Sequence, residues 1–237
     1  MPAHSVATPQ SIHTMTVLTV FRLFRSRLAH YLVLGSFFAA LFYAQQSQAQ
    51  ELNFRVWAGE REIGTHSFNV TQQGGTANVL SKAFYNVKVM FVNVFKYEHT
   101  ANEVWQGDCL ASLTSKTVEN GEKTTIDARQ MENLFAVIRD EEPLLETEEC
   151  IGTYAYWDKQ RLQRSILMNA QTGEIDPVAV TELGIQPIPR LGIEAPSLQI
   201  DSESTTIRLW YSDEGEWLAL LTEAENRPIV YLNEKLL

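Results

Sequence analysis

The chain has 237 residues, of which 45% are hydrophobic and 20% charged, and its formal net charge is −10. This composition is ordinary for a globular protein of one domain, and it excludes a disordered or collagen-like chain. The acidic balance argues against a nucleic-acid partner, because proteins that bind DNA or RNA usually present a basic face.

Residues 1–49 have the composition of an export signal. They contain no Asp or Glu, and their three arginines lie within residues 22–27. An apolar run over residues 31–43 follows, and then a short polar stretch with small residues near its end. A positive region, a short apolar core and small residues before the cleavage point define a secretory signal peptide. We therefore predict cleavage between Ala49 and Gln50, with residues 1–14 as an over-long start.

The alternative is a leader that stays in the membrane as an uncleaved anchor. An apolar core of about 13 residues covers only about 20 Å as a helix, which is short of the ~30 Å hydrocarbon layer. We therefore expect no stable membrane span after cleavage and a periplasmic or secreted protein. The remaining chain would carry 16 basic and 29 acidic residues, a balance that favours solubility and repels polyanions.

Both cysteines, Cys109 and Cys150, follow the leader. Two cysteines in an oxidising compartment indicate one disulfide, which here would close a loop of about 40 residues. The alternative is a catalytic thiol. It is disfavoured because His66 and His99 are the only histidines left after cleavage, and neither has the sequence context of a cysteine protease.

The first half of the remaining chain alternates between apolar and polar residues. Gly-containing turns separate the alternating stretches, and Asn120-Gly121 is the strongest of these hairpin signals because both residues tolerate positive φ. We expect strands within residues 52–56, 63–70, 77–89, 91–105, 110–118 and 124–128.

The second half is less regular. Residues 130–139 fit a short helix or a strand, and prolines make residues 186–197 a loop or an edge segment. Further strands are expected within residues 178–183, 205–211, 217–222 and 229–232. We therefore predict a mainly β fold for residues 50–237: a single curled antiparallel sheet, or an open barrel or β-roll, with few short helices. So many strands must curl or close to protect their edges.

Four segments carry a family resemblance: residues 54–68, 154–157, 169–173 and 209–217. With these segments the chain resembles the exported bacterial family known as domain of unknown function 6134. The resemblance covers almost all of the chain after the leader. It implies an exported, mainly β protein of Gram-negative bacteria, and it carries over no catalytic residues because the family has no established activity.

Known catalytic motifs are absent from the sequence. There is no Gly-x-Ser-x-Gly elbow, no His-Glu-x-x-His and no phosphate-binding Gly-Lys-Ser/Thr loop. His99 and Glu103 would share one face of a strand about 13 Å apart, too far for joint metal coordination. His66 fits a hydrogen-bonded structural histidine better than a general base. We therefore expect no metal and no cofactor.

Aromatic residues are the one unusual feature. Core packing is the favoured explanation, because each large ring buries ~150–250 Å². The alternative is a cavity lining for a ligand, as small barrels can provide. The candidate ligand-facing residues are Trp57, Tyr97, Trp105, Tyr156, Trp157 and Trp210.

Three functions remain open. The favoured one is a non-enzymatic binding or carrier module for an apolar or amphiphilic small molecule. The second is a structural or interaction protein of the cell envelope that binds another envelope protein through an edge strand or an exposed face. The third and least favoured is a hydrolase that uses Glu98, His99 or His66.

Overall fold

A computed structural model describes residues 48–89, 92–132, 134–147, 150–224 and 226–237 of the chain. The predicted signal peptide and its internal features fall almost entirely outside these residues. The two residues at the predicted cleavage point, Ala49 and Gln50, lie near the start of the first strand and pair with Thr71 and Val70. Signal cleavage therefore stays a prediction. No helix within the described part of the chain is long and apolar enough to cross a membrane.

The described residues form 14 strands and two short 3₁₀ helices, η1 (Lys159–Leu162) and η2 (Glu234–Leu236). The strands are β1 (Gln48–Ala58), β2 (Arg61–Gln73), β3 (Thr76–Val89), β4 (Val92–Gln106), β5 (Cys109–Glu119), β6 (Glu122–Met131), β7 (Leu134–Arg139), β8 (Glu142–Thr147), β9 (Ile166–Met168), β10 (Ile175–Pro187), β11 (Glu194–Ser202), β12 (Thr206–Tyr211), β13 (Trp217–Ala224) and β14 (Arg227–Asn233).

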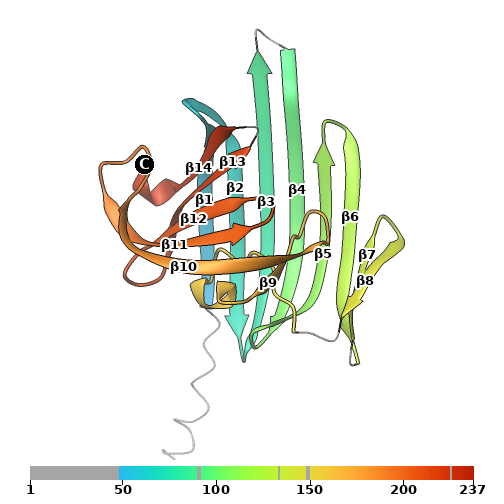
Figure 1. Ribbon diagram of the computed structural model, residues 1–237. Coiled ribbons are helices and arrows are strands. Elements are labelled where there is room, and N and C mark those ends of the chain that lie inside the picture. The colour runs from blue at the N-terminus through green and yellow to red at the C-terminus, as the bar shows by residue number, and fades with distance from the viewer. Residues whose placement is uncertain (1–47, 90–91, 133, 148–149, 225) are drawn as a thin grey trace, which may run out of the picture. The chain divides into compact units, whose positions relative to one another are not determined.

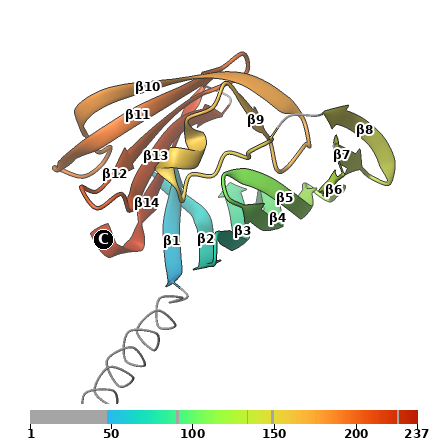
Figure 2. The same ribbon diagram turned by 90° about the horizontal axis from the view of Figure 1, so that it is seen from below.

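All the strands belong to one antiparallel sheet with the order β8-β7-β6-β5-β4-β3-β2-β1-β14-β13-β12-β11-β10-β9. Chain neighbours pair from β1 to β8 and from β9 to β14, the single long-range pairing joins β1 to β14, and β8 and β9 are the two edge strands. The sheet curls so that β10–β13 face β2–β5 across an interior, which the view from below shows most clearly (Figures 1 and 2). The predicted single curled antiparallel sheet is confirmed.

The turns explain much of this connectivity. Asn120 and Gly121 have φ values of 50° and 96°, and Glu119 pairs with Glu122 beside them, as the hairpin signal predicted. Of residues 130–139, which fitted a helix or a strand, 130–131 end β6 and 134–139 form β7. The prediction of a loop or edge at residues 186–197 holds for residues 188–193 and is wrong at both ends, where residues 186–187 and 194–197 pair as parts of β10 and β11. Pro196 lies in β11 just before Ser197, where pairing with β12 begins, so its missing N–H is tolerated.

The sheet has apolar clusters on both faces. The largest one fills the curl, with Trp105, Leu113 and Trp217 among its fully buried members. A second cluster gathers Trp57, Trp210 and Ile188, and a third gathers Val56, Tyr85 and Tyr97. The first and third clusters border the cavity described below.

Candidate ligand-binding site

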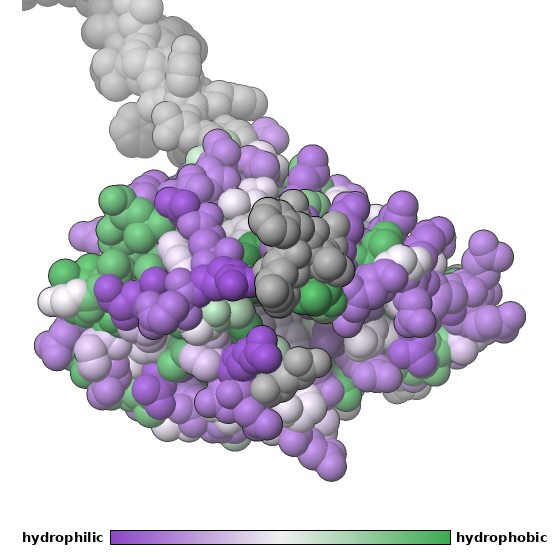
Figure 3. Space-filling model, turned by 90° about the horizontal axis from the view of Figure 1, so that it is seen from above, coloured by the Kyte–Doolittle hydropathy of each residue, from purple (hydrophilic) through white to green (hydrophobic). Residues whose placement is uncertain are grey.

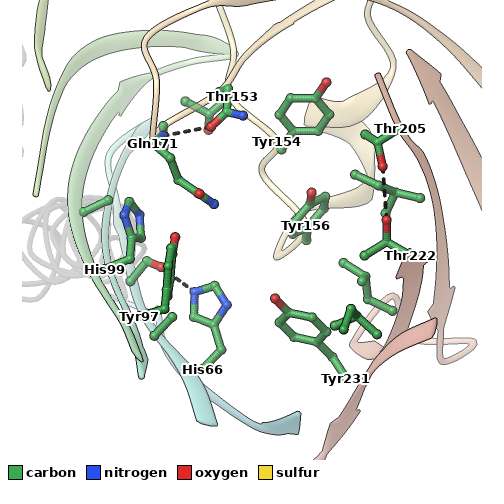
Figure 4. A pocket seen from close by; sticks show the side chains of 18 of the residues that line it. His66, Tyr97, His99, Thr153, Tyr154, Tyr156, Gln171, Thr205, Thr222 and Tyr231 are labelled. Carbon is green, nitrogen blue, oxygen red and sulfur yellow. Dashed lines mark hydrogen bonds between the residues drawn. The ribbon is translucent and has the colours of Figure 1, made fainter. Parts of the chain in front are cut away.

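A cavity of about 500 Å³ lies inside the curl of the sheet. One wall comes from β2–β5 and the opposite wall from β12–β14, while residues 153–157 and 169–171 close a third side (Figure 4). Its volume lies within the range of small-molecule sites, about 300–1,000 Å³.

The register of β3 and β4 explains why the cavity exists. Ser81 pairs with Ala101, and the next inward-facing pair is Ala83 with His99. Larger side chains stand on both sides of these pairs along the strands. Tyr85 pairs with Tyr97 toward the β3–β4 turn, and Ala77 pairs with Trp105 toward the opposite end. Small residues in the middle of two neighbouring strands thus leave space that large rings fill above and below.

Two tyrosines join the walls near the β3–β4 turn. The Tyr85 and Tyr231 hydroxyls are 2.8 Å apart, although the two residues come from β3 and β14. Gly64 and Val56 lie between them in this row of the sheet, and Gly64 adds no side chain beside Tyr85. Burial raises the pKa of both tyrosines above their ordinary value, at which they are already uncharged at neutral pH.

His66 lines the same wall from β2. Its Nε2 lies 2.8 Å from Ser81 Oγ, its Nδ1 lies 3.5 Å from the Tyr85 hydroxyl, and its ring packs 4.3 Å from the Phe68 ring. Burial, with a smaller contribution from the charge of His99, lowers the pKa of His66 to about 3. The imidazole is therefore neutral in the folded protein at physiological pH.

His99 is the second histidine of the cavity. Its Nδ1 lies 2.9 Å from Thr117 Oγ1, and its ring stacks on Tyr97 with an interplanar angle of 26°. Burial lowers the pKa of His99 to about 4, so this ring is also neutral. Tyr97 stacks in turn on Phe95, at 10°, and on Tyr85, at 11°. Nearly parallel rings therefore make up one end of the wall.

Glu103 lies deeper in the cavity and is 8% exposed. Its two oxygens accept hydrogen bonds from Trp105 Nε1 at 2.8 Å and Thr153 Oγ1 at 3.0 Å. Burial raises the pKa of Glu103, and these hydrogen bonds, with the charge of Arg161, oppose that rise. Glu103 thus ties β4 to the segment that crosses the interior.

The crossing segment has further attachments at its start. The predicted disulfide is present, with Cys109 and Cys150 joined across a sequence separation of 41. Leu110 N donates to the Ile151 carbonyl at 2.8 Å, and Arg164 donates to the Cys150 carbonyl at 2.7 Å. Covalent and polar contacts therefore hold the segment against the β4–β5 turn.

Arg161 adds an aromatic contact to this anchorage. Its guanidinium lies 4.8 Å from the Trp105 ring centroid and 5.2 Å from that of Trp157, within cation–π range. It also pairs with Asp158 at 3.0 Å. Arg161 therefore packs on two rings beside the deep end of the cavity.

The charged groups of the cavity lining are all acidic. Among the described lining residues none is Lys or Arg, and the carboxylates belong to Glu103, Glu119, Asp176 and Glu223. Glu119 and Glu223 are exposed, beside the β5–β6 and β13–β14 turns. Figure 3 views the molecule from the side of these turns and shows hydrophilic residues over most of that face, with scattered hydrophobic patches.

The structure separates the six predicted ligand-facing aromatics into two groups. Tyr97, Tyr156 and Trp157 line the cavity, and Trp105 is fully buried beside them and contacts Glu103. Trp57 and Trp210 lie in the second apolar cluster, away from the cavity. Ligand contact by these residues stays a prediction.

Sequence reasoning missed several lining residues, among them Ser81, Ala83, Ala101, Tyr154 and Tyr231. Tyr154 also donates a hydrogen bond to Asp176 at 3.0 Å. The missed signal was the alternation along β4, where every second residue from 95 to 103 lines the cavity. Small residues at such inward-facing positions leave room for a cavity. Whether the small residues of two strands lie side by side depends on the register between those strands.

The comparisons with known proteins identify the family. The family model described as "Domain of unknown function (DUF6134)" matches residues 54–232, so the chain belongs to this family. No curated protein matches the chain. Among solved structures, it is similar to one titled "Crystal Structure of Beta-barrel-like Protein of Domain of Unknown Function DUF1849 from Brucella abortus". The TM-score is 0.59 at 10% identity over 80% of this chain and 97% of that chain, a likeness of fold alone.

Proposed function

We propose that this member of the DUF6134 family is an exported, non-enzymatic carrier that binds one apolar or amphiphilic small molecule inside the curled sheet. The observation that carries the proposal is the cavity of about 500 Å³ that small residues open between aromatic walls. Well-packed interiors rarely leave voids of this size unless a ligand or water occupies them.

Export is supported by the leader composition and by the disulfide, because disulfides persist in oxidising compartments. A periplasmic or secreted carrier would meet its ligand outside the cytoplasm.

A hydrolase is the competing function, and Ser81 with His66 is the arrangement closest to a nucleophile and base. Two features disfavour it. Ser81 lies in the middle of β3 and pairs with β2 and β4, so its backbone N–H is not arranged to stabilise an oxyanion. In addition, a histidine with a pKa of about 3 is a weak general base at neutral pH.

Native mass spectrometry of the disulfide-intact protein from its own organism tests the proposal. We expect a non-covalent adduct of one small molecule, which organic extraction removes and which rebinds to the extracted protein. A protein without any adduct, which also fails to bind the uncharged fluorophore N-phenyl-1-naphthylamine, would refute the carrier function.

Two neighbouring residues of β3 supply a matched pair of variants. Ala83→Trp places an indole inside the cavity, whereas Lys82→Trp places the same indole on the exposed outer face. We expect the first variant to lose the ligand and the second to keep it. Ala101→Leu is a milder filling variant that tests the same point if Ala83→Trp does not fold.

A further inference from the structure

We propose that the cavity selects an uncharged ligand that combines a flat ring with hydrogen-bond-accepting oxygens, and that it rejects organic anions such as fatty acids. This inference rests on the proposed carrier function and names the class of its ligand. Three independent features of the lining support it: charge, unpartnered donors and ring geometry.

The charge of the lining disfavours an anion. Its described residues include four carboxylates and no Lys or Arg. Both histidines are neutral at physiological pH because burial lowers their pKa values to about 3 and about 4. An anionic group that leaves water is costly to bury unless a positive charge pairs with it, and none of these residues supplies one.

A cationic ligand group is also not favoured in the part of the cavity beside Glu103. Glu103 is the buried carboxylate there, and it already accepts hydrogen bonds from Trp105 and Thr153. The guanidinium of Arg161 packs on the Trp105 ring and is close enough to lower the pKa of Glu103. The charge of Glu103 is therefore offset from within the protein.

Hydrogen-bond donors without acceptors line the cavity. Trp157 is 4% exposed, and its Nε1 has no hydrogen-bond partner. Among the interactions of the described residues, the Tyr97 and Tyr156 hydroxyls also lack a partner, and Figure 4 shows both side chains at the cavity. The Tyr97 and Tyr156 hydroxyls can donate to ligand oxygens, or to water in the ligand's absence, whereas the Trp157 Nε1 is enclosed by protein atoms.

The rings of the wall are arranged for a flat partner. Tyr85 and Tyr97 are nearly parallel, at 11° with centroids 5.1 Å apart, and Phe95 continues the series. Tyr156 and Tyr231 lie on other sides of the same space (Figure 4). Aromatic rings stack in offset or edge-to-face geometry, so a ligand ring gains contact with several of them at once.

A matched series of naphthalenes tests ligand class by displacement of N-phenyl-1-naphthylamine. The series has one ring system with four substituents: 2-acetylnaphthalene, 2-methylnaphthalene, 2-naphthoate and 2-naphthylmethylammonium. We expect the acetyl compound to compete best. Its apparent affinity should exceed that of the anion at least about ten-fold, and that of the methyl compound about three-fold or more because the methyl group accepts no hydrogen bond.

Equal or tighter binding of 2-naphthoate or of the ammonium compound would overturn the proposed selection, yet it would leave the carrier function standing because the cavity would still bind a ligand. Equal binding of the acetyl and methyl compounds would overturn the role of the unpartnered donors. A protein that binds neither the fluorophore nor any member of the series would instead refute the carrier function itself.

Charge reversal at the rim gives a second test. Glu119→Lys with Glu223→Lys should raise the affinity for 2-naphthoate several-fold, and high salt should reduce this gain. The control pair, Glu98→Lys with Glu214→Lys, makes the same change in net charge at exposed positions outside the cavity lining. A similar gain in the control pair would show that net charge, and not the cavity rim, decides anion binding.

Discussion

Acidification should destabilise the folded protein through His66. The pKa of this histidine falls from 6.5 to about 3 on folding, chiefly because burial disfavours the charged ring. Below about pH 6.5 the unfolded chain therefore takes up a proton that the folded protein does not. The stability that His66 contributes is complete above that pH, and it is lost as the pH falls toward about 3.

The magnitude follows from the width of this pH window. One pKa unit corresponds to about 1.4 kcal/mol. Between about pH 6.5 and about pH 5 the proton uptake of His66 in the unfolded chain therefore lowers the free energy of unfolding by up to about 2 kcal/mol. Water in the cavity would reduce this figure, because His66 faces the cavity and is only partly buried. Tyr85, Tyr231 and His99 are titratable groups close to it, and all three are uncharged in this range, His99 because burial lowers its pKa to about 4.

The assay is denaturant unfolding of the wild type and of His66→Gln, each at about pH 7 and about pH 5. Gln can still hydrogen-bond Ser81, and it does not titrate. Between about pH 7 and about pH 5, the free energy of unfolding of the wild type should fall by up to about 2 kcal/mol more than that of the variant. Thr65→Gln, on the exposed face of the same strand, is the control and should follow the wild type. The same pH dependence in His66→Gln and the wild type would refute the reasoning.

Two further predictions concern stability. Replacement of Cys109 and Cys150 by Ala should lower the free energy of unfolding by about 4 kcal/mol, the loop-entropy value for a separation of 41 residues; a loss below about 1 kcal/mol in denaturant unfolding would contradict it. Gly64→Ala should cost about 3 kcal/mol, because its φ is 156° and an added Cβ would lie 1.9 Å from the Phe84 carbonyl oxygen. Gly59→Ala, with nothing within 4 Å of its Cβ, should cost clearly less in the same measurement.

The sequence predicted the sheet well because its signals are local. Alternating burial along single strands and the turn at Asn120-Gly121 depend on neighbouring residues only, and both appear in the structure. The pairing of Cys109 with Cys150 was also predictable, since no other cysteine competes. Chain-neighbour pairing then builds almost the whole sheet, and the β1–β14 pairing completes it.

The cavity could not be predicted in the same way, because it depends on register between strands. Ala83 and Ala101 look like ordinary strand residues until pairing places them in adjacent rows beside His99 and Ser81. The abundance of tryptophans also did not show which of them line the cavity. Trp57 follows a register shift in β1 after Val56 and packs in the second cluster, and Trp210 donates its Nε1 hydrogen to the Gln186 carbonyl there.

An open sheet can keep such a cavity because a separate segment holds its third side. The curl alone would let the walls collapse onto the small residues, since dispersion contacts favour a filled interior. Residues 150–157 resist this collapse because the disulfide fixes their start and Thr153 bonds to the buried Glu103. Tyr85 and Tyr231 hold the two walls together near the β3–β4 turn. The contacts that stabilise the fold are thus the same ones that keep the side chains of Tyr97 and Tyr156 around a cavity of about 500 Å³.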